Sequence, residues 1–233
     1  QSQVTLSTLL QGLWALLIGR YSGTRDVLFG ITVSGRPASL PGVETMVGLF
    51  INTVPLRVAI EPEQPLTAWL QALQAAAIEQ QPFEHCAAGQ IQQWSEVPAA
   101  RRLYESLLVF ENYPAVAGSE ADQSFTLQEV HSVGAQTQYP LTVTVFPQQG
   151  LHVTFIFNRA AFAAPDVERL AVHLQALIEK ARREQALQLL RDPRLTLAEV
   201  AFQTGYSEMS TFYRAFRRWT GQTPREYRDS AAQ

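Results

Sequence analysis

Short apolar runs of strand type alternate with longer stretches of helical spacing over the first 180 residues, and this alternation constrains the fold more than any other feature. A sheet built from such strands buries its apolar faces under helices, which predicts an α/β fold with strands of mixed direction. The predicted strands lie at 26–33, 46–58, 103–112, 125–133, 139–146 and 150–158. The predicted helices lie at 6–22, 65–81 and 88–94, and a last one begins at about Pro165.

The predicted strand at 46–58 contains two polar residues, Asn52 and Thr53, inside an otherwise apolar run. The run is too apolar and too rich in β-branched residues for a surface strand, so we expect it to be buried. A buried asparagine without hydrogen-bond partners costs about 1–3 kcal/mol. We therefore expect Asn52 to be a structural hydrogen-bonding residue.

The balance of charge changes near residue 180. Residues 1–180 contain 9 Lys and Arg against 15 Asp and Glu, whereas residues 181–233 contain 9 Arg against 6 acids. A small basic tail on an acidic body is typical of a nucleic-acid-reading module joined to another domain, although solvated surface charge also produces it. We predict two domains, 1–180 and 181–233.

The single cysteine, Cys86, excludes a disulfide within the chain and favours a reducing compartment, with the cytoplasm as the expected location. The longest apolar run, LLQGLWALLIG, has about half of the ~20 residues that span a bilayer, so it predicts a core helix and no membrane anchor. The chain begins at Gln1 without a methionine, and we expect its start to lie further upstream.

The histidines give no catalytic or metal-binding pattern. They are scattered along the chain, at His85, His131, His152 and His173. Their spacing does not match a zinc site, and His85 and Cys86, as sequence neighbours, point to different sides of the chain. We predict no catalytic residue, no cofactor and no metal in this chain.

The tail has the pattern of two short helices joined by a turn. Thr196 is followed three residues later by Glu199, which predicts a capping box at the start of the first helix. Val200 and Ala201 are expected to face inward. Gly205 supplies a left-handed turn, and Ser207 is the expected N-cap of the second helix. This order is the helix-turn-helix pattern.

The second predicted helix of the tail is amphipathic. Its aromatic residues Phe212, Phe216 and Trp219 share one face, which predicts that this face packs inward. Three polar residues lie on the opposite face: Ser210, Arg214 and Arg217. Arginine suits both base edges and phosphates, so this face indicates DNA binding, with a solvated basic surface as the alternative.

Several motifs in residues 4–180 resemble the condensation domain of nonribosomal peptide synthetases. These motifs are VGLFINTVPLR, EQQPFEH, AGQIQQWS, LYESLLVFENYP and YPLTVTVFPQQGLHVTFIFN. The resemblance implies the C-terminal one of two lobes that are similar to chloramphenicol acetyltransferase. The two lobes enclose a tunnel for two carrier-bound substrates, and Asn52 and Arg57 would either line the tunnel or have a structural role.

The family's amide-forming chemistry is assigned to a His-His-x-x-x-Asp-Gly motif in the other lobe, which this sequence does not contain. The resemblance therefore implies a lobe that is inactive alone. Its implied partners are the missing N-terminal lobe and the carrier-protein domains of a synthetase.

The tail resembles the second helix-turn-helix of AraC-family transcription regulators. The matching residues are Gly205, Tyr206, Ser207, Phe212, Arg214, Phe216, Gly221, Thr223, Pro224, Tyr227 and Arg228. The resemblance implies a DNA-binding set of Met209, Ser210, Thr211, Arg214, Arg217 and Arg218. Because the family carries two such units and one is present here, binding is expected to be weak and salt-dependent, and tight binding would require a homodimer.

One helix is expected to run through the junction, since residues 167–191 contain no glycine or proline. Its apolar residues around 167–181 and around 186–190 lie on faces roughly 140° apart, which predicts that its two halves bury different sides. Three functions remain open: a DNA-binding regulator with the lobe in the sensor position, a synthetase fragment with an incidental tail, and a junction without joint function. We take the DNA-binding regulator as the main hypothesis.

Overall fold

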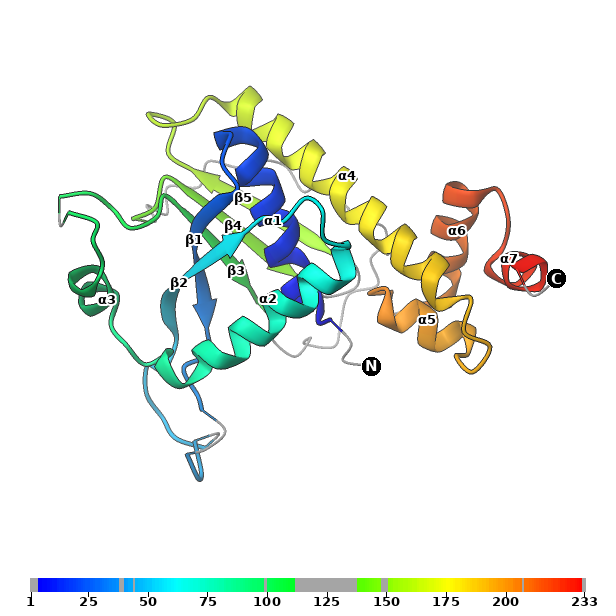
Figure 1. Cartoon of the computed structure of the whole chain (residues 1–233), viewed down its shortest axis with the longest axis horizontal. Coiled ribbons are helices and arrows are strands. Elements are labelled where there is room, and N and C mark those ends of the chain that lie inside the picture. Colours follow the sequence, from blue (N-terminus) through cyan, green and yellow to red (C-terminus); the bar gives the residue numbers. More distant parts are fainter. Residues whose placement is uncertain are drawn as a thin grey trace. The chain divides into compact units, whose positions relative to one another are not determined.

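The computed structural model describes residues 4–37, 40–43, 45–98, 100–111, 138–147, 151–206 and 208–231. The chain divides into two compact units (Figure 1). Of the described residues, those within 4–110, 138–145 and 154–170 form the first unit, and those within 111, 146–153 and 171–231 form the second.

Among the described residues, five strands form one mixed sheet in the order β2-β1-β3-β4-β5. Their bounds are Asp26–Val33 for β1, Asn52–Ala59 for β2, Ser106–Phe110 for β3, Leu141–Phe146 for β4 and His152–Phe157 for β5. β1 is antiparallel to β2 and parallel to β3, and β3 is parallel to β4. The predicted α/β fold with strands of mixed direction is confirmed, while the strand predicted at 125–133 lies outside the described residues.

The burial of each strand follows its sequence. In β4 the first five residues are all buried, as expected for an inner strand covered on both faces. In β5 buried residues alternate with half-buried ones, the period of a strand with one core-facing side. Phe155 of β5 packs edge-on against Trp14 with ring centroids 6.4 Å apart, so an aromatic pair joins the sheet to its first helix.

Two helices cross the sheet in Figure 1, α1 (Leu6–Ser22) and α2 (Leu66–Gln80). The Thr5 side chain caps α1 by accepting the N–H of Thr8, and Gly23 ends it in a left-handed conformation with φ 68°. This ending is the one that the sequence predicts. A short 3-10 helix, η1 (Gln81–Phe83), follows α2 and leads to α3 (Ala88–Trp94).

The strand predicted at 46–58 begins later than expected, because β2 starts at Asn52. The preceding residues are irregular and exposed, with Val47 103% and Leu49 92% exposed, so the expectation of a buried strand over the whole run was wrong for its first half. The Asn52 Nδ2 donates to the carbonyl oxygens of Glu84 and Cys86 at 2.7 and 2.8 Å. Asn52 therefore has the structural hydrogen-bonding role expected of it.

Helix α4 (Ala164–Leu189) runs unbroken through the junction, as predicted. The buried residues of its first part are Val167, Leu170, Ala171, Leu174, Ile178 and Ala181. Ala186 and Leu190, at and just beyond its end, belong instead to the core of the tail. Ile178, Arg182, Ala186 and Leu190 are buried at intervals of four, so the buried face shifts gradually along the helix. That its two halves bury different sides stays a prediction.

The tail contains three helices, α5 (Leu197–Gln203), α6 (Met209–Thr220) and α7 (Pro224–Ala231). They share a small core with the end of α4, formed by Ala186, Leu190, Val200, Ala201, Phe212 and Phe216. Tyr206, Trp219 and Tyr227 pack against it as partly buried residues. The inward face predicted from the aromatic spacing is therefore confirmed.

The predicted cap of α5 is confirmed, and α7 has a capping box that was not predicted. Thr196 and Glu199 form the capping box of α5, and Thr223 and Glu226 form the same reciprocal bonds at α7. The N-cap of α6 is Glu208, one residue later than the predicted Ser207, which lies outside the described residues.

Within the described residues, no helix combines the length and apolar character that crossing a bilayer requires.

Candidate functional site

The exposed face of α6 is the candidate nucleic-acid interface. Because Phe212 and Phe216 are fully buried on its other side, the rotation of the helix is fixed. The exposed members of the predicted DNA-binding set are Ser210, Arg214, Arg217 and Arg218. Three arginines on one twelve-residue helix form a positive surface that suits phosphates and base edges.

Two members of the predicted set lie elsewhere. Thr211 is 8% exposed and belongs to the packed face, so its predicted role as an exposed contact residue does not agree with its position. Met209 is half-buried and packs against the tail core. The Thr211 Oγ1 also accepts a hydrogen bond from Arg214 Nη2 at 3.4 Å, which makes Thr211 a support for an exposed arginine.

Arg218 of the exposed set contacts a carboxylate of α4. Its Nη2 lies 3.5 Å from the Glu179 Oε1, and the side chains are 66% and 38% exposed. A pair this exposed is weak, so the guanidinium remains available to a stronger anionic partner.

Arg182 of α4 is the functional candidate that the sequence analysis missed. It is 5% exposed, its guanidinium lies 5.0 Å from the centroid of the Tyr206 ring, and its Nη2 donates to the Gly205 oxygen at 3.4 Å. Burial lowers the pKa of this guanidinium from its ordinary value. One signal was available, because Arg182 stands at helical spacing from two buried residues, Ala186 and Leu190.

In the lobe, Arg57 is bound to the neighbouring strand. Its Nη2 lies 2.7 Å from an Asp26 oxygen, across the antiparallel pair of β2 and β1. The hydrogen bond from Arg57 holds the pKa of the Asp26 carboxyl below its ordinary value. Both side chains are mostly exposed, and we read the pair as a cross-strand contact.

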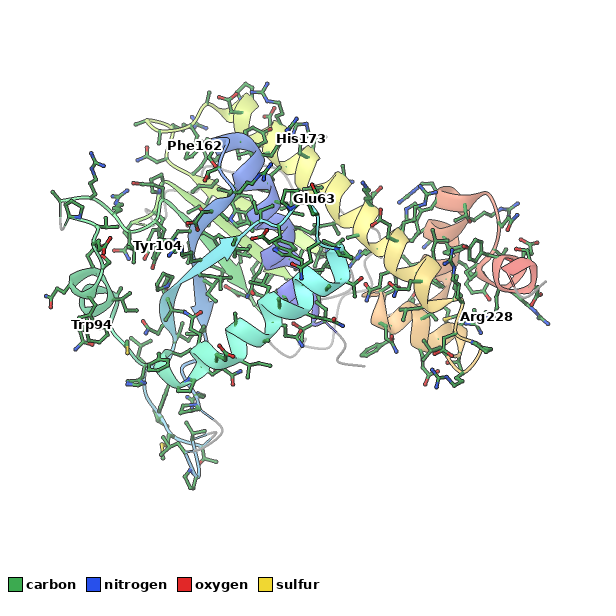
Figure 2. All side chains as sticks on the ribbon, in the orientation of Figure 1. Glu63, Trp94, Tyr104, Phe162, His173 and Arg228 are labelled. Carbon is green, nitrogen blue, oxygen red and sulfur yellow. The ribbon has the colours of Figure 1, made fainter. Side chains whose placement is uncertain are left out.

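A pocket of about 220 Å³ lies next to α3 in the lobe. Two of its residues, Tyr104 and Tyr139, stack with centroids 5.3 Å apart, and their hydroxyl oxygens lie 3.2 Å apart. Burial raises the pKa of the Tyr104 hydroxyl well above its ordinary value. Figure 2 shows Tyr104 beside the sheet and Trp94 on α3. Neither tyrosine was predicted as a site residue, although each lies two residues before a paired position of β3 and β4.

The prediction of no catalytic residue was based mainly on the scattered positions of the histidines. His85 is exposed on the segment after η1, and His131 lies outside the described residues. Among the residues that the structure does describe, no cluster of three or more His, Cys, Asp or Glu side chains is placed to hold a metal ion.

The two parts of the chain have different folds. The first is a mixed sheet covered by helices, and the second is a helix-turn-helix unit. The sequence profile described as "Condensation domain" matches residues 1–199, and the chain belongs to this family. A second profile, "Bacterial regulatory helix-turn-helix proteins, AraC family", matches residues 190–229. Both resemblances drawn from the motifs are therefore confirmed.

The similar curated proteins are large synthases. One component of the linear gramicidin synthase of Brevibacillus parabrevis is 44% identical over 189 residues, which are 80% of this chain and 2% of that protein. Chondramide synthase cmdD of Chondromyces crocatus is 44% identical over 197 residues, 84% of this chain and 5% of that protein. Tyrocidine synthase 2 of Brevibacillus parabrevis is 39% identical over 206 residues, 86% of this chain and 6% of that protein. The chain thus spans a small part of each relative.

Several solved structures have a fold similar to that of this chain. One solved structure, "The crystal structure of CT", has a TM-score of 0.61 at 21% identity. The match covers 76% of this chain and 41% of that chain. The first condensation domain of the calcium-dependent antibiotic synthetase, solved with a substrate analogue, has a TM-score of 0.54 at 17% identity over 73% of this chain and 37% of that one. The match to the condensation profile and the identity to the synthases support the synthetase interpretation better than the DNA-binding regulator.

Proposed function

We propose that residues 1–180 are the C-terminal lobe of a peptide-synthetase condensation domain. In this proposal the lobe takes part in amide formation between carrier-bound substrates only when a second lobe, which supplies the paired histidines, completes the tunnel. The similarity to synthases and the chain's match to about 41% of a related solved chain support this reading. The proposed domains remain 1–180 and 181–233.

The observation that carries this proposal is an exposed apolar loop before β2. Its exposed apolar residues are Leu40, Met46, Val47, Leu49 and Ile51. Val47 and Leu49 are almost wholly in water, and a cluster of apolar side chains in such a position marks an interaction surface. A missing lobe of the same domain is the partner that fits an incomplete condensation fold.

The loop is held in place by its own contacts. Both terminal nitrogens of Arg36 donate to backbone carbonyls of the loop, those of Val43 and Met46, and the guanidinium lies 4.2 Å from the centroid of the Phe50 ring. A Cβ on Gly35 would collide with the Phe50 carbonyl oxygen, so the loop ends approach as closely as glycine permits. These contacts join the described residues at the two ends of the loop.

The test is reconstitution of amide formation. The chain alone, given aminoacyl- and peptidyl-carrier thioesters, is expected to give no amide above the uncatalysed background. Adding the N-terminal lobe of a similar synthase is expected to give product, detected by mass spectrometry. Leu49→Asp should abolish that product, whereas Ile78→Asp, which alters an exposed apolar residue on α2, should not. Turnover by the chain alone, or equal activity of both variants, would overturn the proposal.

We propose DNA binding by the tail as a second function. It is supported by the exposed arginines of α6, by the match to the AraC-family profile and by the tail's own core. One such unit covers little DNA, so tight binding would require a homodimer. Both functions fit a reducing location such as the cytoplasm, where the single Cys86 stays a thiol.

A salt titration on duplexes selected from a random pool tests this second function. Arg214→Ala should weaken binding to the selected duplex by roughly 1–3 kcal/mol and spare a scrambled duplex, since a base contact carries the specificity. Arg217→Ala should weaken binding to both duplexes equally and reduce the salt slope by about 0.9. Unchanged binding in both variants would refute the proposed reading face.

A further inference from the structure

One face of α4 contacts the helix-turn-helix through polar side chains. Gln185 Nε2 donates to the Gln203 oxygen at the end of α5 at 3.2 Å. One turn earlier, Arg182 reaches the Gly205 oxygen and the Tyr206 ring, both in the turn. The last turns of α4 lie beside α5 and α6 (Figure 1). This helix therefore contacts the end of α5 and the turn that sets the direction of α6.

Burying the charged guanidinium of Arg182 at this position costs folding free energy. Arg182 is 5% exposed, and its Nε is buried without a hydrogen-bond partner among the described residues. Replacing buried charges by apolar residues of similar size is often neutral or stabilising. The cost of burying the guanidinium opposes the stabilisation from its contacts with Gly205 and Tyr206, so we expect methionine at this position to change the stability of the tail little.

The contacts of Arg182 are concentrated on the turn. Gly205 adopts φ 82°, and a Cβ at this glycine would lie 3.0 Å from the Arg182 Nη2. Tyr206, under the guanidinium, packs against Phe212 and Trp219 of α6 with centroids 5.6 and 6.2 Å apart. A continuous series of contacts thus runs from α4 through the turn to the buried face of α6.

We propose that Arg182 is a positioning residue for DNA recognition, holding the turn at residues 204–206 so that the exposed face of α6 keeps one orientation. The inference rests on the proposed DNA binding of the tail. Arg182 itself is buried and contacts no DNA. Its role is to limit the angle between α5 and α6, because α6 must enter a groove while α5 crosses the DNA backbone.

The experiment compares Arg182→Met with Arg183→Met in the full chain. The two changes are chemically the same, but Arg183 is exposed on the neighbouring side of α4, so it controls for the lost charge. Three quantities are measured: the unfolding midpoint of the tail, amide hydrogen exchange of residues 203–212, and DNA affinity as a function of salt. Arg182→Lys shows whether charge alone restores the role.

For Arg182→Met we expect an unchanged or higher unfolding midpoint, faster exchange confined to the turn, and roughly tenfold weaker binding to the selected duplex, the size of one lost base contact. The salt slope should equal that of Arg183→Met, because neither residue contacts a phosphate. Arg182→Lys should restore little, since an ammonium lacks the planar group that covers the Tyr206 ring.

Unaltered exchange in the turn would overturn the proposal whether or not the chain binds DNA. If the unaltered chain does not distinguish selected from scrambled DNA, the DNA-binding function is refuted. Faster exchange in the turn of Arg182→Met would then still establish the structural role of Arg182. A tail that unfolds at a lower midpoint in Arg182→Met would show a stabilising residue and contradict the inference.

Discussion

At the scale of single residues, Arg218 has two competing partners. One is the Glu179 carboxylate at 3.5 Å, and the other, in the DNA-binding proposal, is a phosphate. An exposed ion pair contributes about 0–1 kcal/mol, whereas a phosphate contact also releases counterions from the duplex. The carboxylate therefore lowers the net benefit of moving Arg218 onto DNA.

We predict that Glu179→Gln strengthens DNA binding by up to about fivefold, the upper value of an exposed ion pair, and makes the salt slope steeper by about 0.9. Glu184→Gln is the control, because it removes the same charge from α4 at a residue paired with Lys180. The measurement is fluorescence anisotropy at several salt concentrations. Equal gains in both variants would mean that overall charge alone is responsible.

Asn52 allows a second prediction at this scale. Its amide nitrogen donates to two carbonyls of the segment after η1, and its Oδ1 accepts the Thr53 N–H at 2.9 Å. Asn52→Ala leaves these partly buried groups without partners, so we expect a loss of about 1–3 kcal/mol in the free energy of unfolding. Urea unfolding measures it. Asn158→Ala removes a bond in an exposed turn and should cost clearly less.

At the scale of elements, the parts that the sequence predicted are those with a local physical cause. The end of α1 at Gly23 follows from glycine conformation, and the start of α5 at Thr196 follows from side-chain capping. Both depend only on neighbouring residues. Apolar runs predicted the described strands because burial in a sheet requires them. The fold class and the packing face of α6 were therefore accessible from sequence alone.

The parts that were not predicted depend on distant residues. The segment before β2 has the composition of a buried strand, and only the complete fold shows that Val47 and Leu49 are left exposed. The burial of Arg182 was not predicted, because a charged residue is rarely buried and its partners are 23 and 24 positions further on. Tertiary contacts decide both cases.

The capping boxes of α5 and α7 predict a pH dependence. Backbone hydrogen bonds from Thr196 and Thr223 lower the pKa of Glu199 and Glu226 from the ordinary value of 4.5. A lowered folded-state pKa gives stability that is present above the unfolded value and is lost as the pH falls through the folded value. The tail should therefore lose helix as the pH falls below about 4.5.

Circular dichroism of thermal unfolding between pH 7 and pH 3 measures this effect. Glu199→Gln and Glu226→Gln together should flatten the dependence, since glutamine accepts the same hydrogen bond without titrating. Asp229→Asn, on the exposed surface of α7, removes a charge without removing a cap and is the control. A profile as steep in the double variant as in the unaltered chain would contradict the assignment.

At the scale of the whole molecule, the chain contains two sets of buried residues that belong to different units. The lobe core is centred on the sheet and includes Trp14, Phe29 and Phe155. The tail core is small, and its two phenylalanines, Phe212 and Phe216, are fully buried. A core of this size supplies little more than about 3–5 kcal/mol, so the loss of one large side chain removes most of its stability.

We predict that Phe212→Ala unfolds the tail and leaves the sheet folded, because a Phe→Ala change in a core costs about 3–5 kcal/mol. Hydrogen exchange with mass spectrometry separates the two parts: α5, α6 and α7 should lose protection while β1, β3 and β4 keep it. Phe202→Ala alters a phenylalanine of the same tail that is 79% exposed, and it should change neither part. Loss of protection in the strands together with the tail would show one cooperative unit and contradict the two-domain proposal.

If the sheet is retained, Phe212→Ala also separates the two proposed functions: it should abolish DNA binding while leaving the reconstituted amide formation intact.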